Sequence, residues 1–127
     1  MKANEIQVKK PSEQNEYYFK EGCYILELLN DESDAECSIA RARVLAGKQT
    51  RWHKLLDTSE RYVILEGKAE VHVGELKETV SKGNVIVIPS GEQQRIVNKG
   101  EKDLVFLAIC TPRFKATNYV DLDAHLE

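Results

Sequence analysis

The strongest constraint on the fold is a series of short β-branched segments separated by glycines at nearly even spacing. The segments are RYVILEG, KAEVHVGEL, NVIVIPSG, QRIVNKG and DLVFLAIC, and the turns between them contain Gly67, Gly74, Gly83, Gly91 and Gly100. β-Branched and aromatic residues favour extended backbone, whereas glycine permits tight turns. The pattern predicts a closed antiparallel sheet, and by itself it leaves a sandwich and a barrel equally open.

The region before these turns also has strand character. EYYF and CYILELL are rich in aromatic and aliphatic residues, and in SIARARVLAG two sets of side chains alternate as on a strand with two different faces. We expect one domain over residues 1–127. A loose arm covers 1–15, N-terminal strands 16–36, the barrel 37–111 and a tail 112–127, in which a short helix could form.

Composition argues against several classes of partner. The 127 residues carry a formal net charge of -3, which gives no electrostatic reason to expect nucleic acid. No apolar run approaches the roughly 20 residues of a membrane helix, and the polar N-terminus lacks the apolar stretch of a signal peptide. Three cysteines without CxxC spacing make a disulfide framework or a thiolate metal site a poor match. We expect a cytoplasmic protein that binds neither nucleic acid nor membrane.

Two segments carry the polar residues that favour a barrel with an internal site. They are GKQTRWHKLLDTSERYVILEG over residues 47–67 and GNVIVIPSGEQQRIVN over residues 83–98. Together they resemble the paired motifs of the cupin family, G-x5-H-x-H-x3,4-E-x6-G and G-x5-P-x-G-x2-H-x3-N. The matching positions are Gly47, His53, Glu60, Gly67, Gly83, Pro89, Gly91 and Asn98. Leu55 and Gln94 stand where the family pattern has histidines.

The resemblance covers about residues 38–111 and implies an all-β fold, a jelly-roll barrel of two antiparallel sheets. Small one-domain cupins of this sort are often described as similar to mannose-6-phosphate isomerase. The family geometry implies that His53, Glu60 and Gln94 meet inside the barrel. One nitrogen and two oxygens would suit a divalent Fe, Mn, Ni or Zn ion. The alternative is a metal-free network in which these three side chains hydrogen-bond one another and a ligand.

Other residues are candidates for the same pocket. Arg41 and Arg43 would form an anion site for substrate if their face of the strand turns inward, and would otherwise be solvated. Tyr62 shares a strand face with Glu60 and is a candidate catalytic acid beside it, the alternative being aromatic packing. Leu55 would make one wall of a substrate pocket apolar. Two further histidines are expected to lie apart from the site, His72 on an outer face and His125 in the tail.

These features predict a barrel that binds a small molecule. One reading is a metal-dependent isomerase, lyase or dioxygenase acting on a small polar metabolite, with Glu60 or Tyr62 near the transferred proton. The other is a non-catalytic, metal-free ligand-binding or sensor barrel, which Leu55 favours. Because the aromatic segment Tyr17, Tyr18 and Phe19 would be an aggregation hazard as an uncovered strand edge, we also expect a homodimer with this segment at or near the interface.

Overall fold

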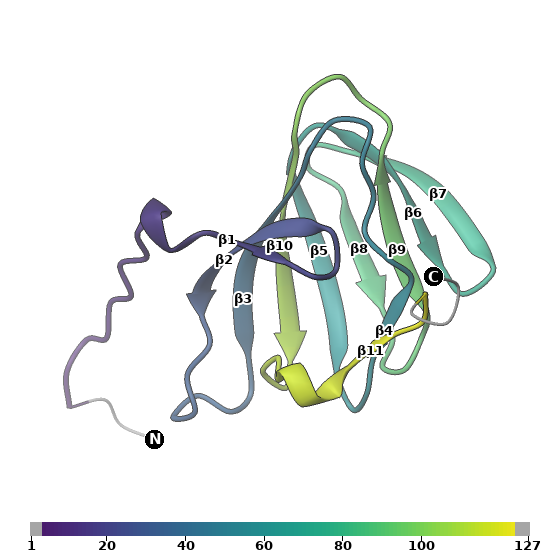
Figure 1. Ribbon diagram of the computed structural model, residues 1–127. Helices are drawn as coiled ribbons and strands as arrows, with labels where there is room; N and C mark the ends of the chain where they lie inside the picture. The colour runs from purple at the N-terminus through teal and green to yellow at the C-terminus, as the bar shows by residue number, and fades with distance from the viewer. Residues whose placement is uncertain (1–3, 124–127) are drawn as a thin grey trace.

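The computed structural model describes residues 4–123 and is an all-β barrel of two antiparallel sheets (Figure 1). The fold class expected from the sequence is confirmed. Helix is limited, among these residues, to two single turns of 3-10 type, η1 (Glu13–Asn15) and η2 (Ala116–Asn118). Within the described residues, no helix has the length and apolar character needed to cross a membrane.

The larger sheet has six strands and carries most of the wall on which the functional pocket lies. In spatial order the strands are β1 (Tyr17–Phe19), β2 (Cys23–Leu29), β3 (Ser38–Val44), β10 (Leu104–Thr111), β5 (Ser59–Glu66) and β8 (Val85–Ile88). Both edge strands, β1 and β8, are short. The two ends of the expected barrel region lie side by side, since β3 pairs with β10 in register from Ser38↔Cys110 to Val44↔Leu104.

The smaller sheet has five strands and closes the barrel opposite the first. In spatial order they are β11 (Tyr119–Asp121), β4 (His53–Leu55), β9 (Gln94–Asn98), β6 (Lys68–Val73) and β7 (Leu76–Ser81). β4 is placed between β9 and β11, with His53 directly opposite Gln94 on one side and opposite Asp121 on the other.

The two ends of the chain behave differently. Residues 4–15 before β1 are exposed, and the η1 turn within them is tied to β3 by the ion pair of Glu13 with Arg41 (Figure 1). The tail folds back onto the barrel, where the expected short helix is the single turn η2, and the residues after it form β11. The sequence did not indicate this last strand. The pairing of β11 with β4 brings the tail to the mouth of the barrel.

Alternation along the strands sorts side chains between a core and an outer surface, as the period of two requires. A buried apolar cluster fills one end of the barrel and includes Val44, Ile64, Val71, Ile96 and Leu104. The other end is lined by aromatic, small and polar side chains and is left partly open. The division of the barrel interior into a packed end and an open end determines where a ligand can bind.

Candidate functional site

The pocket exists because small side chains occupy inward positions on two adjacent strands. Ala40 and Ala42 of β3 face inward beside Ala108 of β10, and Ala40 lies directly opposite Ala108. A methyl group at each position leaves space that a larger side chain would fill. The resulting cavity has a volume of about 60 Å³ and opens to solvent on one side.

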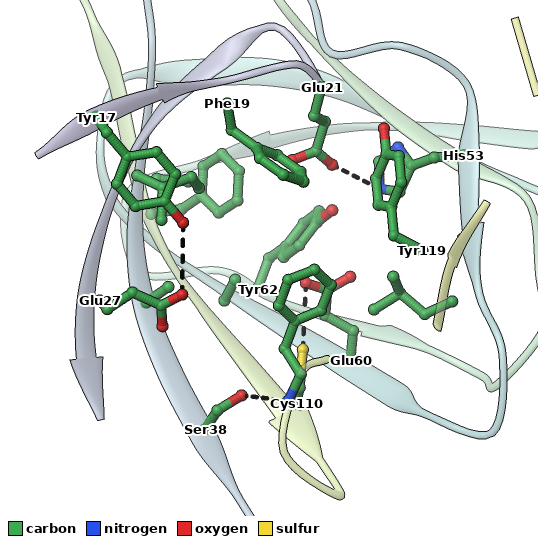
Figure 2. Close-up of a pocket in the computed structure, with 17 residues that line it drawn as sticks. Tyr17, Phe19, Glu21, Glu27, Ser38, His53, Glu60, Tyr62, Cys110 and Tyr119 are labelled. Carbon is green, nitrogen blue, oxygen red and sulfur yellow. Dashed lines mark hydrogen bonds and ion pairs between the residues drawn. The ribbon is translucent and has the colours of Figure 1, made fainter. Parts of the chain in front are cut away.

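The polar lining of this cavity comes from both sheets. Figure 2 shows Glu21, Glu60 and Tyr62 around the central space, with Glu21 directed at the His53 ring. The lining is completed by aromatic and small residues from β1, β2, β3, β10 and the tail. The residues that line the cavity are Tyr17, Phe19, Glu21, Ile25, Glu27, Ser38, Ala40, Ala42, His53, Leu55, Glu60, Tyr62, Phe106, Ala108, Cys110, Phe114 and Tyr119.

His53 is held on both of its ring nitrogens. It is 1% exposed, its Nδ1 lies 2.7 Å from the carbonyl oxygen of Arg51, and its Nε2 lies 2.6 Å from Oε1 of Glu21. Because both partners only accept hydrogen bonds, both nitrogens carry protons and the ring is an imidazolium. Burial by itself would lower the pKa of His53, but the Glu21 carboxylate and the hydrogen bond to it outweigh burial and raise that pKa to about 9.

Glu21 is a site residue that sequence reasoning missed. It lies in the turn between β1 and β2, is 13% exposed at its side chain, and is positioned by the following Gly22, whose φ of +103° is a conformation that favours glycine. The Arg51 amide donates to the Glu21 carbonyl oxygen at 2.7 Å, which fixes this turn against the strand that carries His53. Burial opposes ionisation of Glu21, but the facing His53 charge lowers its pKa below the ordinary value. In the sequence, Glu21 is marked only by its place in a turn and by the glycine that follows it. These are weak signals of a site residue, because only the folded chain brings Glu21 to His53.

Glu60 lies at the base of the cavity with one oxygen unused. Its Oε2 accepts a hydrogen bond from the Cys110 thiol at 3.6 Å, whereas its Oε1 has no hydrogen-bond partner among the described residues. Burial raises the pKa of Glu60 to about 7 and the Glu21 carboxylate adds to the rise, while the His53 charge and the Gln94 amide oppose it. A buried carboxyl oxygen without a partner costs free energy unless a ligand or water supplies one.

Gln94 and Tyr62 form the third part of the site. The Tyr62 hydroxyl donates a hydrogen bond to Oε1 of Gln94, and both side chains are buried. Burial raises the pKa of Tyr62 well above its usual value, so its phenol stays protonated. The structure thus brings His53, Glu60, Gln94 and Tyr62 to one end of the barrel, with Tyr62 lining the cavity and Gln94 behind it.

The donor set does not fit the divalent metal that the resemblance implies. A metal needs a lone pair on an imidazole nitrogen, and both nitrogens of His53 face acceptors. The Gln94 oxygen already accepts from Tyr62, and Leu55 offers no donor atom. Across residues 4–123, no group of three or more His, Cys, Asp or Glu side chains has an arrangement that could hold a metal ion. The chemistry that these side chains support is proton transfer and hydrogen bonding by the carboxyl, imidazolium and hydroxyl groups themselves.

The expectation that Arg41 and Arg43 bind substrate is contradicted. Ala40 and Ala42 take the inward face of β3, so the arginines point outward. Arg41 is paired with Glu13 at 2.6 Å and Glu16 at 3.2 Å. Arg43 is paired with Glu16 at 2.7 Å and with Asp103 at 3.0 Å. The alternation predicted two faces correctly, but Ile39 and Leu45 on the arginine face made the direction ambiguous.

Leu55 is buried and lines the cavity, so the apolar wall expected there is present. His72 lies away from the cavity, where its Nε2 is 2.8 Å from Glu70 and its ring meets Trp52 edge to face. His125 lies outside the described residues.

Aromatic rings form the outer part of the pocket, and most come from segments outside the two motifs. Phe19 of β1 meets Phe114 and Tyr119 edge to face at 6.3 and 5.3 Å between ring centroids. Tyr119 also stacks on the His53 ring at 5.2 Å with an angle of 19° between planes. The Phe114 amide donates to the Ser38 hydroxyl at 2.8 Å, which anchors the tail against β3. The mouth of the pocket is thus an aromatic rim.

The comparisons with known proteins agree with this architecture. The cupin domain model matches residues 40–110. An uncharacterized protein of Methanocaldococcus jannaschii is 35% identical over 100 residues, which are 77% of this chain and 80% of that protein. The chain belongs to the cupin family. As a cupin, it departs from the family pattern at Leu55 and Gln94, which are the positions that bear on metal binding.

Solved cupin structures share the fold at low sequence identity. KdgF from Halomonas sp. superposes with a TM-score of 0.76 at 15% identity, covering 89% of this chain and 99% of that one. Pac13 of Streptomyces, a nucleoside dehydratase, gives 0.75 at 12% identity over 91% and 92% of the two chains. A predicted oxalate decarboxylase from Thermotoga maritima gives 0.67 at 25% identity over 83% and 92%.

Proposed function

We propose that this cupin is a proton-transfer enzyme of the isomerase or lyase class, acting on a small metabolite with Glu60 as the group that moves the proton. The observation that carries the proposal is the unpartnered Oε1 of a buried Glu60 at the cavity. Burial withdraws that oxygen from bulk water. The Gln94 amide and the Cys110 thiol act on the Glu60 carboxyl group, but no donor among the described residues makes a hydrogen bond to Oε1, so a bound substrate is its natural partner.

The environment of Glu60 suits this role. An acid–base group works best when its pKa lies near the operating pH, because both protonation states are then accessible. Burial brings the pKa of Glu60 to about 7. The carboxylate would take a proton from a carbon atom of the substrate and become a carboxylic acid. In an isomerisation it would then return that proton to the far carbon of an adjacent double bond as that double bond shifts by one position. In a dehydration it would return the proton to a hydroxyl departing from the adjacent carbon, where a new carbon–carbon double bond forms.

The His53–Glu21 ion pair carries no net charge, but its imidazolium acts on Glu60 and is fixed in place near this chemistry. The imidazolium is locked by the Arg51 carbonyl and the Glu21 carboxylate, so it does not have to reorganise when charge develops on the substrate. Its field opposes the rise in the pKa of Glu60. We assign His53 to electrostatic stabilisation and Glu21 to holding His53 in its charged form.

Deuterium exchange tests the proposal even while the substrate is unidentified. The protein is incubated in D2O with pools of small metabolites, and loss of individual C–H signals is followed by proton NMR. Glu78, which is exposed on β7, provides a control carboxylate. Exchange that disappears in Glu60→Gln, persists in Glu78→Gln, and is unaffected by a chelator supports the proposal. Exchange that survives in Glu60→Gln, or that a chelator abolishes, overturns it.

A second candidate is a barrel that binds a small molecule without transforming it. The buried Leu55 and the aromatic rim favour this candidate, because they provide an apolar container whose affinity needs no chemistry. A metabolite that binds at the pocket in the same NMR pools and shows no exchange at any carbon would favour binding over catalysis.

A further inference from the structure

We infer that the pocket selects a small organic cation, a protonated amine on a short apolar body, over an anionic metabolite. This inference rests on the proposed function only in that both place the ligand in the same cavity beside Glu60. The charges, rings and size of the cavity each support it.

The ionisable lining of the cavity is acidic. Its acidic and basic members are Glu21, Glu27, Glu60 and His53, and no lysine or arginine lines it among the residues that the structure describes. His53 and Glu21 neutralise each other at 2.6 Å. Glu27 receives a weak hydrogen bond from the Tyr17 hydroxyl, at 3.5 Å. Oε1 of Glu60 has no hydrogen-bond partner in the described part of the chain. Two carboxyl groups therefore lack a cation in that lining.

The nearest cations outside the lining do not change this balance. Arg113 acts on Glu27 from a distance, as a minor influence on its pKa. Lys20 places its Nζ over the Tyr119 ring, 5.2 Å from the centroid. Arg41 and Arg43 are committed to carboxylates on the outer face of β3. An anionic ligand would find the Tyr119 hydroxyl as an unpartnered donor, but it would meet the Glu27 and Glu60 carboxyl groups with no lysine or arginine in the described lining. Like charges brought together in this way are costly.

The aromatic rim adds a second attraction for positive charge. Among the described residues, six rings line the cavity: the rim residues Phe19, Phe114 and Tyr119, then Tyr17 of β1, and the buried Tyr62 and Phe106. Ring faces attract ammonium groups through their quadrupole, with more effect where water is excluded. The Lys20 ammonium over Tyr119 shows that this rim accepts a cation in the folded chain.

The cavity also limits the size of the group it encloses. On the scale in which one water takes roughly 10–15 Å³, a volume of about 60 Å³ corresponds to about four to six non-hydrogen atoms. A butylammonium ion is in this range, with its charge directed to Glu60 and its chain among the rings. A larger ligand would extend through the mouth past the aromatic rim.

Titration of the isotope-labelled full chain with three probes of matched length tests the inference by NMR. The probes are butylammonium, 1-butanol and butyrate. We expect butylammonium to bind roughly tenfold more tightly than 1-butanol, with shifts at pocket residues, and butyrate to give no pocket shifts. Glu60→Gln should bring the butylammonium and 1-butanol affinities close together while leaving 1-butanol binding intact. Glu78→Gln should leave all three unchanged.

Binding of butyrate as tight as that of butylammonium, or absence of pocket binding by all three probes, would overturn the inference. If Glu60→Gln fails to give a folded spectrum, Glu27→Gln replaces it, with a smaller loss of the amine preference expected. The readouts separate the two proposals. An amine preference without deuterium exchange removes the proton-transfer function alone, and exchange with a preference for butyrate removes the charge selectivity alone.

Discussion

The buried pair of His53 and Glu21 makes a quantitative prediction about stability and pH. The pKa of His53 is raised from the ordinary 6.5 to about 9 in the fold. A histidine of this kind stabilises the fold fully below pH 6.5, and the contribution is lost as pH rises through about 9. The difference in pKa corresponds to roughly 3 kcal/mol. His53 is almost fully buried, so solvent screening does not reduce this figure much.

Glu21→Gln removes the carboxylate and leaves a neutral amide of the same size. Burial then dominates at His53 and should bring its pKa down to 6.5 or below, because the largest influence that raised it is gone. At about pH 6 the variant should lose up to about 3 kcal/mol of unfolding free energy. At about pH 10 the loss should approach zero, since His53 is neutral in the wild-type protein as well.

Two measurements check this prediction. An NMR titration of the His53 ring, assigned with a His53→Asn variant, gives the pKa directly, and urea unfolding between about pH 6 and about pH 10 gives the stability difference. Glu78→Gln provides an exposed-carboxylate control that should show no pH-dependent loss. A wild-type His53 that titrates near its ordinary pKa of 6.5, or a stability difference that does not change with pH, would refute the assignment of His53 as a buried imidazolium.

Glu60, Gly22 and Tyr18 offer three further tests. The pKa of Glu60 is raised from 4.5 to about 7, so the wild-type fold should lose stability as pH rises through that window. Over the same window, the unfolding free energy of Glu60→Gln in urea should rise by roughly 3 kcal/mol relative to that of the wild-type protein. A difference between the two proteins that does not change with pH would contradict this. Gly22→Ala would place a Cβ atom 2.9 Å from the Gln49 carbonyl oxygen and should cost roughly 1–3 kcal/mol in unfolding free energy. Gly47→Ala should cost less, because a Cβ atom there has no neighbour within 4 Å, and equal costs would contradict the close contact at Gly22. Tyr18 is 63% exposed on edge strand β1, where the expected homodimer would cover it. Light scattering should give twice the 14.5 kDa chain mass for the wild-type protein and the monomer mass for Tyr18→Lys. A monomeric wild-type protein would contradict the homodimer.

The sequence was most informative where spacing determines strand register. His53, Glu60 and Gln94 were predicted to lie near one another, and they do, because each sits at a fixed distance from a glycine or proline turn within one motif. The barrel itself could be predicted for the same reason, since alternation and regular turns are local properties.

The rest of the site depends on contacts between distant segments. Glu21 reaches His53 through a turn whose carbonyl group accepts a hydrogen bond from the Arg51 amide. Tyr119 reaches His53 through β11, which pairs with β4. Neither segment carries a local pattern that points to the pocket. Arg43 was ambiguous because alternation shows that a strand has two faces and not which of them is buried, and the alanines opposite gave no strong apolar signal.

The aromatic rim and the proposed proton-transfer group come from different parts of the chain. The groups suited to handling a proton come from strands of the central barrel, whereas Phe19, Phe114 and Tyr119 come from the segments that precede and follow it. Exchanging those flanking segments between proteins with this barrel would be expected to re-target ligand choice while leaving the reactive carboxyl in place. The scaffold thus offers a starting point for building new selectivities around Glu60, the proposed proton-transfer group.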